Sequence, residues 1–111
     1  MTINVLLLGR LGVVVDDVSQ QLHLPNVAIF GGTGIDDVRA TFAAGTVDVV
    51  IMGAGIDLET RLEIVREVFR TSDTTTVHMK DVASGPAGFM PFVRSILVGL
   101  QPSGAVTSPP A

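Results

Sequence analysis

Seven polar side chains stand at or near the ends of four short apolar runs, and their types suggest anion binding or proton transfer. They are Arg10, Thr33, Asp57, His78, Lys80, Asp81 and Ser84. Arginine and lysine would supply fixed positive charge, and the two hydroxyl groups would supply hydrogen-bond donors. Histidine, lysine and aspartate are also common acid–base groups. The residue types therefore fit either binding of a phosphate or carboxylate group or a small acid–base enzyme.

Glycine-rich turns follow the same runs and would add backbone amide donors, which favour anions at helix N-termini. We predict a ligand-binding site formed by Gly9, Arg10, Gly12, Gly32, Thr33, Gly34, Gly53, Gly55, His78, Lys80, Ser84 and Gly85. A purely structural alternative is that tight turns favour glycine and helix starts favour aspartate. In that case Arg10 and Lys80 are solvated loop charges, Asp57 is only a helix cap, and His78 is a buried neutral histidine.

Short runs of aliphatic and β-branched residues alternate with helical patterns along the chain. The runs are residues 3–8, 27–30, 47–52 and 75–79. This alternation predicts an α/β fold with a four-stranded parallel sheet, a small three-layer flavodoxin-like or minimal Rossmann-like sandwich, with strand order 2-1-3-4. Ligands bind such sheets at the carboxyl ends of the strands. Residues 1–100 are expected to form a single domain, and residues 101–111 a flexible C-terminal tail.

Four helices are expected between and after these strands. The first covers about residues 14–22, and the second begins with Asp36 as its cap and ends at Gly45 in a left-handed conformation. Asp57 is expected to cap the third. The apolar stripe of that third helix is predicted to be Leu58, Leu62, Val65 and Phe69, with Ile64 and Val68 widening it. So wide a stripe predicts packing over more than one strand, or contact with a partner.

The last predicted helix, residues 89–100, is apolar on nearly every side, with Arg94 and Ser95 as its clearly polar positions. A helix of this kind must be buried all round, and a sheet of four strands covers one side only. We therefore predict a homodimer, with an interface formed by Phe89, Phe92, Val93, Ile96, Leu97 and Leu100.

Composition argues against several classes of partner. The net charge of -4 and the absence of Trp and Tyr oppose nucleic-acid binding. The chain has no cysteine, which excludes disulfides and thiolate chemistry, and its two histidines are too far apart to suggest a metal site. No run approaches the roughly 20 apolar residues that cross a bilayer, and no signal peptide is evident. We expect a cytoplasmic protein without a membrane partner.

Two short stretches resemble known families. Ile29-Phe30-Gly31-Gly32-Thr33-Gly34 resembles the Gly-Ala-Thr-Gly opening of atypical short-chain dehydrogenases, which would imply a dinucleotide. However, Asp37 replaces their third glycine and would repel a pyrophosphate, so no cofactor is expected.

The second stretch runs from Lys80-Asp81-Val82 to residues 92–96 and resembles the ending of some response-regulator receiver domains. The resemblance implies a receiver-like shape. The acidic pair that such a domain carries after its first strand is replaced by Gly9-Arg10, and Met52-Gly53 replaces the phosphate-accepting aspartate. The phosphorylation chemistry is therefore not expected.

Three functions remain open from the sequence. The first is a non-covalent binding module for a small anionic ligand, acting as a homodimer. The second is a ligand-free interaction or receiver-like scaffold domain that uses the apolar last helix. The third is a small enzyme that uses Lys80, His78 and Asp81 in acid–base chemistry, although no complete catalytic constellation is evident.

Overall fold

The computed structural model describes residues 2–10, 12–22, 24–83 and 85–100 of the chain. Four parallel strands form one sheet in the order β2-β1-β3-β4, which confirms the predicted fold class and strand order. The strands are β1 (Ile3–Leu8), β2 (Val27–Gly32), β3 (Val49–Met52) and β4 (Thr76–Met79). The predicted tail, residues 101–111, lies outside the described residues, as does Ser84.

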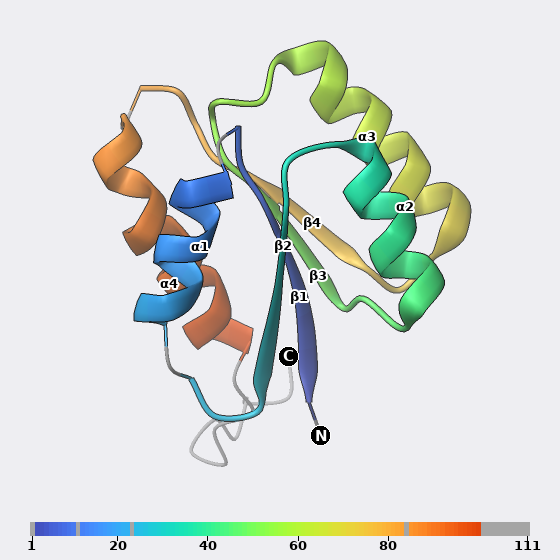
Figure 1. Ribbon diagram of the computed structural model, residues 1–111, viewed down its shortest axis with the longest axis horizontal. Coiled ribbons are helices and arrows are strands. Elements are labelled where there is room, and N and C mark those ends of the chain that lie inside the picture. The colour runs from blue at the N-terminus through green and yellow to red at the C-terminus, as the bar shows by residue number, and fades with distance from the viewer. Residues whose placement is uncertain (1, 11, 23, 84, 101–111) are drawn as a thin grey trace, which may run out of the picture.

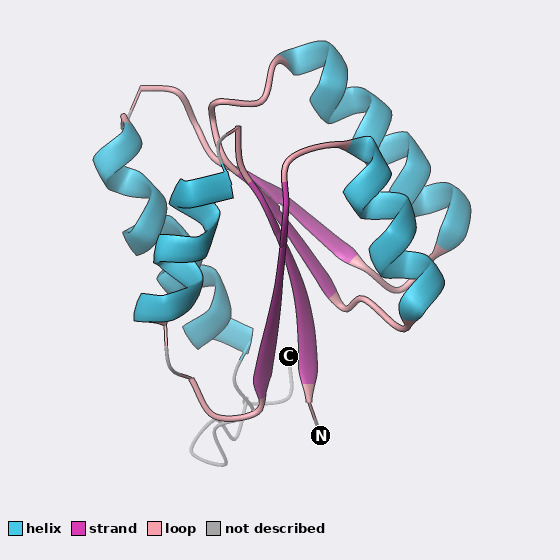
Figure 2. Cartoon of the chain, viewed as in Figure 1, coloured by secondary structure: helices cyan, strands magenta, loops and turns pink. Residues whose placement is uncertain are grey.

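Helices cover both faces of the sheet, which makes the three layers visible in Figures 1 and 2. α1 (Gly12–Gln21) and α4 (Phe89–Leu100) lie on one face, with the short 3-10 helix η1 (Pro86–Gly88) leading into α4. α2 (Ile35–Ala44) and α3 (Leu58–Thr71) lie on the other. No helix in the described ranges is long and apolar enough to span a membrane.

The alternation of side chains along the strands divides the core into two layers. Val5, Leu7, Val49 and Ile51 pack beneath α1 and α4. Leu6, Leu8, Val50 and Met52 pack beneath α2 and α3. The two central strands, β1 and β3, are therefore apolar on both faces, as expected of parallel strands covered by helices on each side.

Helix α2 begins and ends differently from the prediction. Its N-cap is Gly34, and Asp36 lies in the first turn. The C-cap Gly45 has φ 171°, which is extended backbone, so the predicted left-handed conformation is wrong. Asp37 supplies the polar contact at the helix start, because its carboxylate accepts a hydrogen bond from the Thr33 amide at 2.8 Å.

Helix α3 turns a different face to the core than its apolar spacing predicted. Ile64 and Val68 are fully buried, whereas Leu58, Leu62 and Phe69 are 67%, 50% and 53% exposed. The sheet ends at β4, so α3 has strands beneath one side only, and its wide apolar surface extends past the strands that it can cover. The predicted stripe is therefore largely solvent-exposed.

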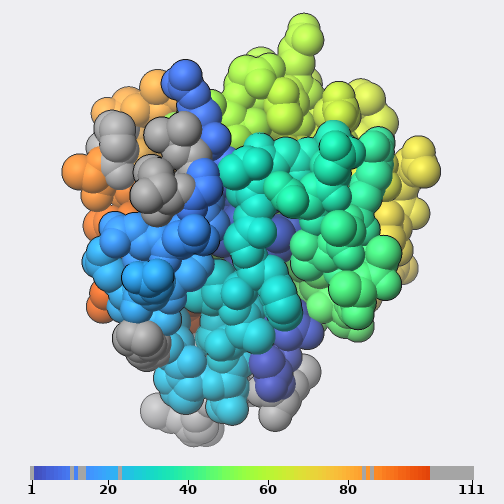
Figure 3. Space-filling model, in the orientation of Figure 1, coloured from blue at the N-terminus to red at the C-terminus, as the bar shows by residue number. Residues whose placement is uncertain are grey.

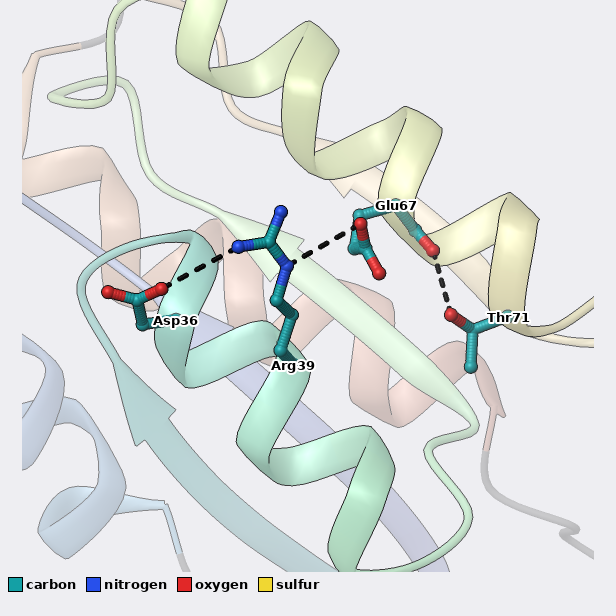
Figure 4. Close-up of polar contacts among 4 residues, drawn as sticks. All are labelled: Asp36, Arg39, Glu67 and Thr71. Atoms are coloured by element: carbon teal, nitrogen blue, oxygen red, sulfur yellow. Dashed lines mark hydrogen bonds and ion pairs between the residues drawn. The ribbon is translucent and has the colours of Figure 1, made fainter.

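An ion pair joins α2 to α3 next to this core (Figure 4). Arg39 Nε lies 3.6 Å from Glu67 Oε1, and Arg39 Nη1 lies 3.7 Å from Asp36 Oδ1. The Thr71 hydroxyl donates to the Glu67 backbone carbonyl at 3.0 Å. Of these contacts, the Arg39–Glu67 pair joins the two helices, and the other two lie within one helix each.

Helix α4 buries more of its apolar surface within the monomer than the sequence predicted. Phe89, Val93 and Leu97, three of the predicted interface residues, are core residues that are at most 6% exposed. Phe92 and Ile96 are half-buried against the same core. The buried side of α4 packs in one core layer with β1, β3 and the apolar residues Val15, Val18 and Leu22. Val98 and Leu100 retain substantial exposure, 54% and 37%.

Candidate anion-binding site

The turns that follow the strands lie next to one another at the carboxyl edge of the sheet. The ladder of backbone hydrogen bonds continues one residue past β1, β3 and β4: Gly9 donates to Gly32 at 3.2 Å, Gly53 to Leu8 at 2.8 Å, and Lys80 to Met52 at 2.9 Å. Because the strands are parallel, their last residues align, and these bonds extend that alignment into the turns. The structure thus brings together the glycines predicted after β1, β2 and β3.

Arg61 holds the turn between β3 and α3, a role that was not predicted from the sequence. Its guanidinium donates from Nε to the Ile56 carbonyl at 2.8 Å, from Nη1 to that of Lys80 at 3.2 Å, and from Nη2 to that of Gly53 at 3.4 Å. A planar group with several fixed donors can bridge separate carbonyls in this way. Arg61 therefore ties the end of β4 to the turn that follows β3.

One sequence signal could have identified Arg61. It precedes Ile64 by three residues and Val68 by seven, so helical periodicity places it on the same face as those buried residues. A charged side chain on the buried face of a helix requires polar partners. Its nearest polar partners are the backbone carbonyls at the strand ends, where the observed hydrogen bonds form.

Arg10, in the turn after β1, contacts the same turn between β3 and α3. A Cβ atom added to Gly55 would lie 2.8 Å from Arg10 Cβ and 3.5 Å from Arg10 Cδ, so Arg10 rests directly on a residue that has no side chain. Arg10 is itself exposed. The β3–α3 turn is thus in contact with one arginine from the turn after β1 and another from α3.

Lys80 is the buried cation of this edge. It follows β4 directly, is 2% exposed, and donates from Nζ to the Asp81 carbonyl at 2.9 Å. The structural alternative of a solvated Lys80 is therefore wrong, because the side chain lies inside the fold. Burial of an ammonium group is unfavourable unless it has hydrogen-bond partners, and Lys80 and Asp81 each have further polar interactions.

Acidic side chains already accept hydrogen bonds from backbone amides at the start of two helices at this edge, one amide before α2 and one within α3. Asp37 accepts from the Thr33 amide, next to Gly34. Asp57 is the N-cap of α3, as predicted, and accepts from the Thr60 hydroxyl and amide. These hydrogen bonds from Thr60 lower the pKa of the Asp57 carboxyl below its ordinary value, the hydroxyl making the largest contribution.

The start of α1 differs from these two turns. The helix begins at Gly12 and has no acidic residue in its first turn. Arg10 stands two residues before it. The positive end of this helix dipole therefore lies beside a cationic side chain. Of the three glycine turns predicted to bind an anion, the one after β1 has the most favourable charge.

The remaining predicted residues lie within β4, in the segment that follows it, or outside the described chain. His78 lies inside β4, half-buried, with Nε2 3.2 Å from the Thr76 hydroxyl on the same strand. Gly85 has φ 71° and precedes η1. Asp81 is exposed. Ser84 is not among the described residues.

One groove lies away from this edge. It has a volume of about 420 Å3 and lies between β2 and the C-terminal half of α2, on the side of the molecule drawn in Figure 3. It is lined by Asn4, Phe30, Ala40, Thr41, Ala44, Gly45 and Thr46. No residue predicted for ligand binding lines this groove.

Comparisons with protein-family models, with curated proteins and with solved structures found no match to this chain.

Proposed function

We propose that this chain is a non-covalent binding module for a small anionic ligand, bearing phosphate or carboxylate, at the carboxyl edge of its parallel sheet. One observation carries the proposal. Three of the seven lysine and arginine residues lie at or next to the turn between β3 and α3, although the chain is acidic overall. Arg10 packs on Gly55, Arg61 donates to the Gly53 carbonyl, and Lys80 follows the neighbouring strand β4, where Arg61 binds its backbone carbonyl. Cations concentrated at the ligand-binding edge of a parallel sheet favour an anion there.

The three cations would serve different purposes. Arg61 is engaged with three carbonyl groups and keeps the turn in place. Lys80 is buried and adds fixed positive charge. Arg10 is exposed and stands at the start of α1, so it is the residue best able to contact a ligand directly. The amides of the first turn of α1 would complete the coordination of the anion.

Acid–base catalysis has less support from the same residues. His78 pairs with Thr76 within β4, and its strand position is two residues before Lys80. Lys80 donates to a backbone carbonyl. The His78–Thr76 contact joins two positions of one strand, and no predicted ligand-binding residue other than His78 takes part in it, so binding is the function that we propose.

Inorganic phosphate provides a direct test. Thermal unfolding would be followed in phosphate and in chloride at matched pH and ionic strength. Phosphate at ten times its Kd stabilises the folded state by about 1.4 kcal/mol. The substitution Arg10→Gln should abolish the increase in Tm without changing Tm in chloride, because Arg10 is exposed.

Arg94→Gln is the matched control, since it removes the same charge from an exposed position on α4. It should retain the full phosphate effect. Equal phosphate effects in the two variants, or none in the unmodified protein at tens of millimolar phosphate, would contradict the proposed site.

A further inference from the structure

Helix α3 and strand β4 leave an apolar surface uncovered at one edge of the molecule. Leu58, Leu62 and Phe69 are each at least half exposed, and Val65 is half-buried beside them. Met79, 46% exposed, lies on edge strand β4. Its side chain shares the α3 face with Val77, which packs in that core layer, because strand side chains alternate. We call these five residues, Leu58, Leu62, Val65, Phe69 and Met79, the α3 surface.

A row of charges runs along α3 next to its apolar stripe. Glu59 and Glu63 occupy the first half of the helix, and Arg66 and Arg70 the second; all four are exposed. Within the described part of the chain none of them forms an ion pair. Like charges four residues apart repel each other within a helix. The helix dipole favours Glu59 and Arg70 in the first and last turns. Glu63 and Arg66 have the i,i+3 spacing of an ion pair, but they do not form one among the described residues.

The apolar stripe and the row of charges are both arranged symmetrically about the middle of α3. In an antiparallel pair of α3 helices related by a two-fold axis near Ile64, Leu58 lies opposite Phe69 of the second copy and Leu62 lies opposite Val65. In the adjacent row Glu59 lies opposite Arg70, and Glu63 lies opposite Arg66. Each of the two glutamates therefore lies opposite an arginine of the second copy. Like charges that repel each other within one helix are paired with opposite charges across the interface.

We propose that a second copy of this chain covers the α3 surface in an antiparallel, two-fold symmetric dimer. An isologous interface must be complementary to itself, and the order of acids and bases along α3 meets that condition. The proposal moves the predicted dimer interface from α4, whose Phe89, Val93 and Leu97 are buried in the core, to α3 and edge strand β4. It is independent of the anion site.

The size of the α3 surface limits the area that the dimer can bury, and therefore its affinity. The helix has 14 residues, which corresponds to a length of about 21 Å. A single helix pair with a flanking edge strand falls short of the roughly 800 Å2 per partner found in stable complexes. The expected dimer is therefore a weak one that dissociates in the micromolar range.

Sedimentation of the full chain over a concentration series tests the proposal. The protein should convert from monomer to dimer as its concentration rises. Leu62→Glu, at a half-exposed position, should leave it monomeric throughout. Val98→Glu is the matched control, because it places the same charge at a similarly exposed apolar position on α4, and it should dimerise normally.

Charge reversal tests the antiparallel arrangement itself. Glu63→Arg and Arg66→Glu should each weaken dimerisation about tenfold, because each places like charges opposite one another at two symmetry-related sites. The double variant Glu63→Arg/Arg66→Glu restores the pairing and should recover the original dissociation constant. Circular dichroism of each variant establishes that the fold is retained.

Several outcomes would overturn the proposal. These are a protein that stays monomeric at every concentration, a dimer that Leu62→Glu does not affect, and a dimer that Val98→Glu abolishes. Failure of the double charge reversal to recover dimerisation, with both single reversals impaired, would overturn the antiparallel arrangement.

Discussion

Arg61 donates from Nη1 to the carbonyl oxygen of Lys80 over 3.2 Å, so a side chain of α3 holds the backbone at the end of β4. The same guanidinium holds Gly53 and Ile56 in the turn before α3. One residue therefore connects the carboxyl ends of two adjacent strands. The position of the buried Lys80 depends on that connection as well as on the β3–β4 ladder.

Removal of the Arg61 guanidinium should destabilise the fold. Arg61→Ala removes a donor from three carbonyls, of which that of Gly53 keeps a backbone amide, that of Ile56 at 3.5 Å, and it should lower the free energy of unfolding by about 2 kcal/mol. Arg61→Lys keeps the charge but cannot bridge three carbonyls, so it should lose nearly as much. Urea unfolding followed by circular dichroism measures both, with Arg94→Ala on the exposed side of α4 as the control. Full stability of Arg61→Lys would show that charge alone matters there.

The orientation of α3 predicts opposite outcomes for two aliphatic residues that are neighbours on the helix. Ile64→Ala creates a cavity at a fully buried position and should cost about 2–5 kcal/mol of unfolding free energy. Leu62→Ala, at a half-exposed position, should cost about 0.5 kcal/mol or less when measured on the monomer at low concentration. Comparable losses in the two variants would contradict the observed face of α3.

The Asp57 cap predicts a specific pH dependence. Hydrogen bonds from Thr60 lower the pKa of the folded carboxyl below its unfolded value of about 3.9. Between these two pKa values the unfolded chain binds more protons, so the stabilisation is complete above the unfolded pKa and disappears as the pH falls through the folded pKa. Asp57→Asn retains a capping side chain but does not titrate. The Tm of this variant should therefore fall less steeply than that of the unmodified protein below about pH 4.

Asp57→Ala separates the cap from its charge. This variant should be less stable than Asp57→Asn near neutral pH, because it leaves the Thr60 amide without its acceptor. If the two variants had the same Tm at neutral pH and the same slope in acid, the side-chain cap would not contribute to stability.

The contact between Arg39 and Glu67 should contribute modestly to the packing of α2 on α3. The two groups lie 3.6 Å apart, with Arg39 56% and Glu67 16% exposed. Partly exposed ion pairs of this kind are typically worth about 0.2–1 kcal/mol. A double-mutant cycle with Arg39→Gln and Glu67→Gln measures the coupling directly, and 1 M NaCl should reduce it. A coupling of zero would leave Val38, Phe42 and Ile64 as the residues that join the two helices.

The strand order and the helix–sheet–helix layers could be predicted from the local pattern of the sequence. Apolar runs of strand length, each followed by a glycine turn and a helical segment, permit essentially one kind of sheet, because short right-handed crossovers force neighbouring strands to be parallel. That reasoning found the strand order and the helices. It also found Asp57 as a cap, since capping depends on residues within one turn of each other.

The face of each helix and the partner of each cation were decided by the tertiary structure. Leu58, Leu62 and Phe69 have the spacing of a core stripe, yet the sheet ends at β4 and leaves them exposed. Lys80 follows an apolar run directly, as a solvated loop lysine would, yet its side chain is buried in the folded chain. Arg61 bonds to carbonyls that precede it by five and eight residues and to one that follows it by nineteen. Such contacts depend on where the backbone ends up in space, and a periodic pattern along one helix carries no information about that position.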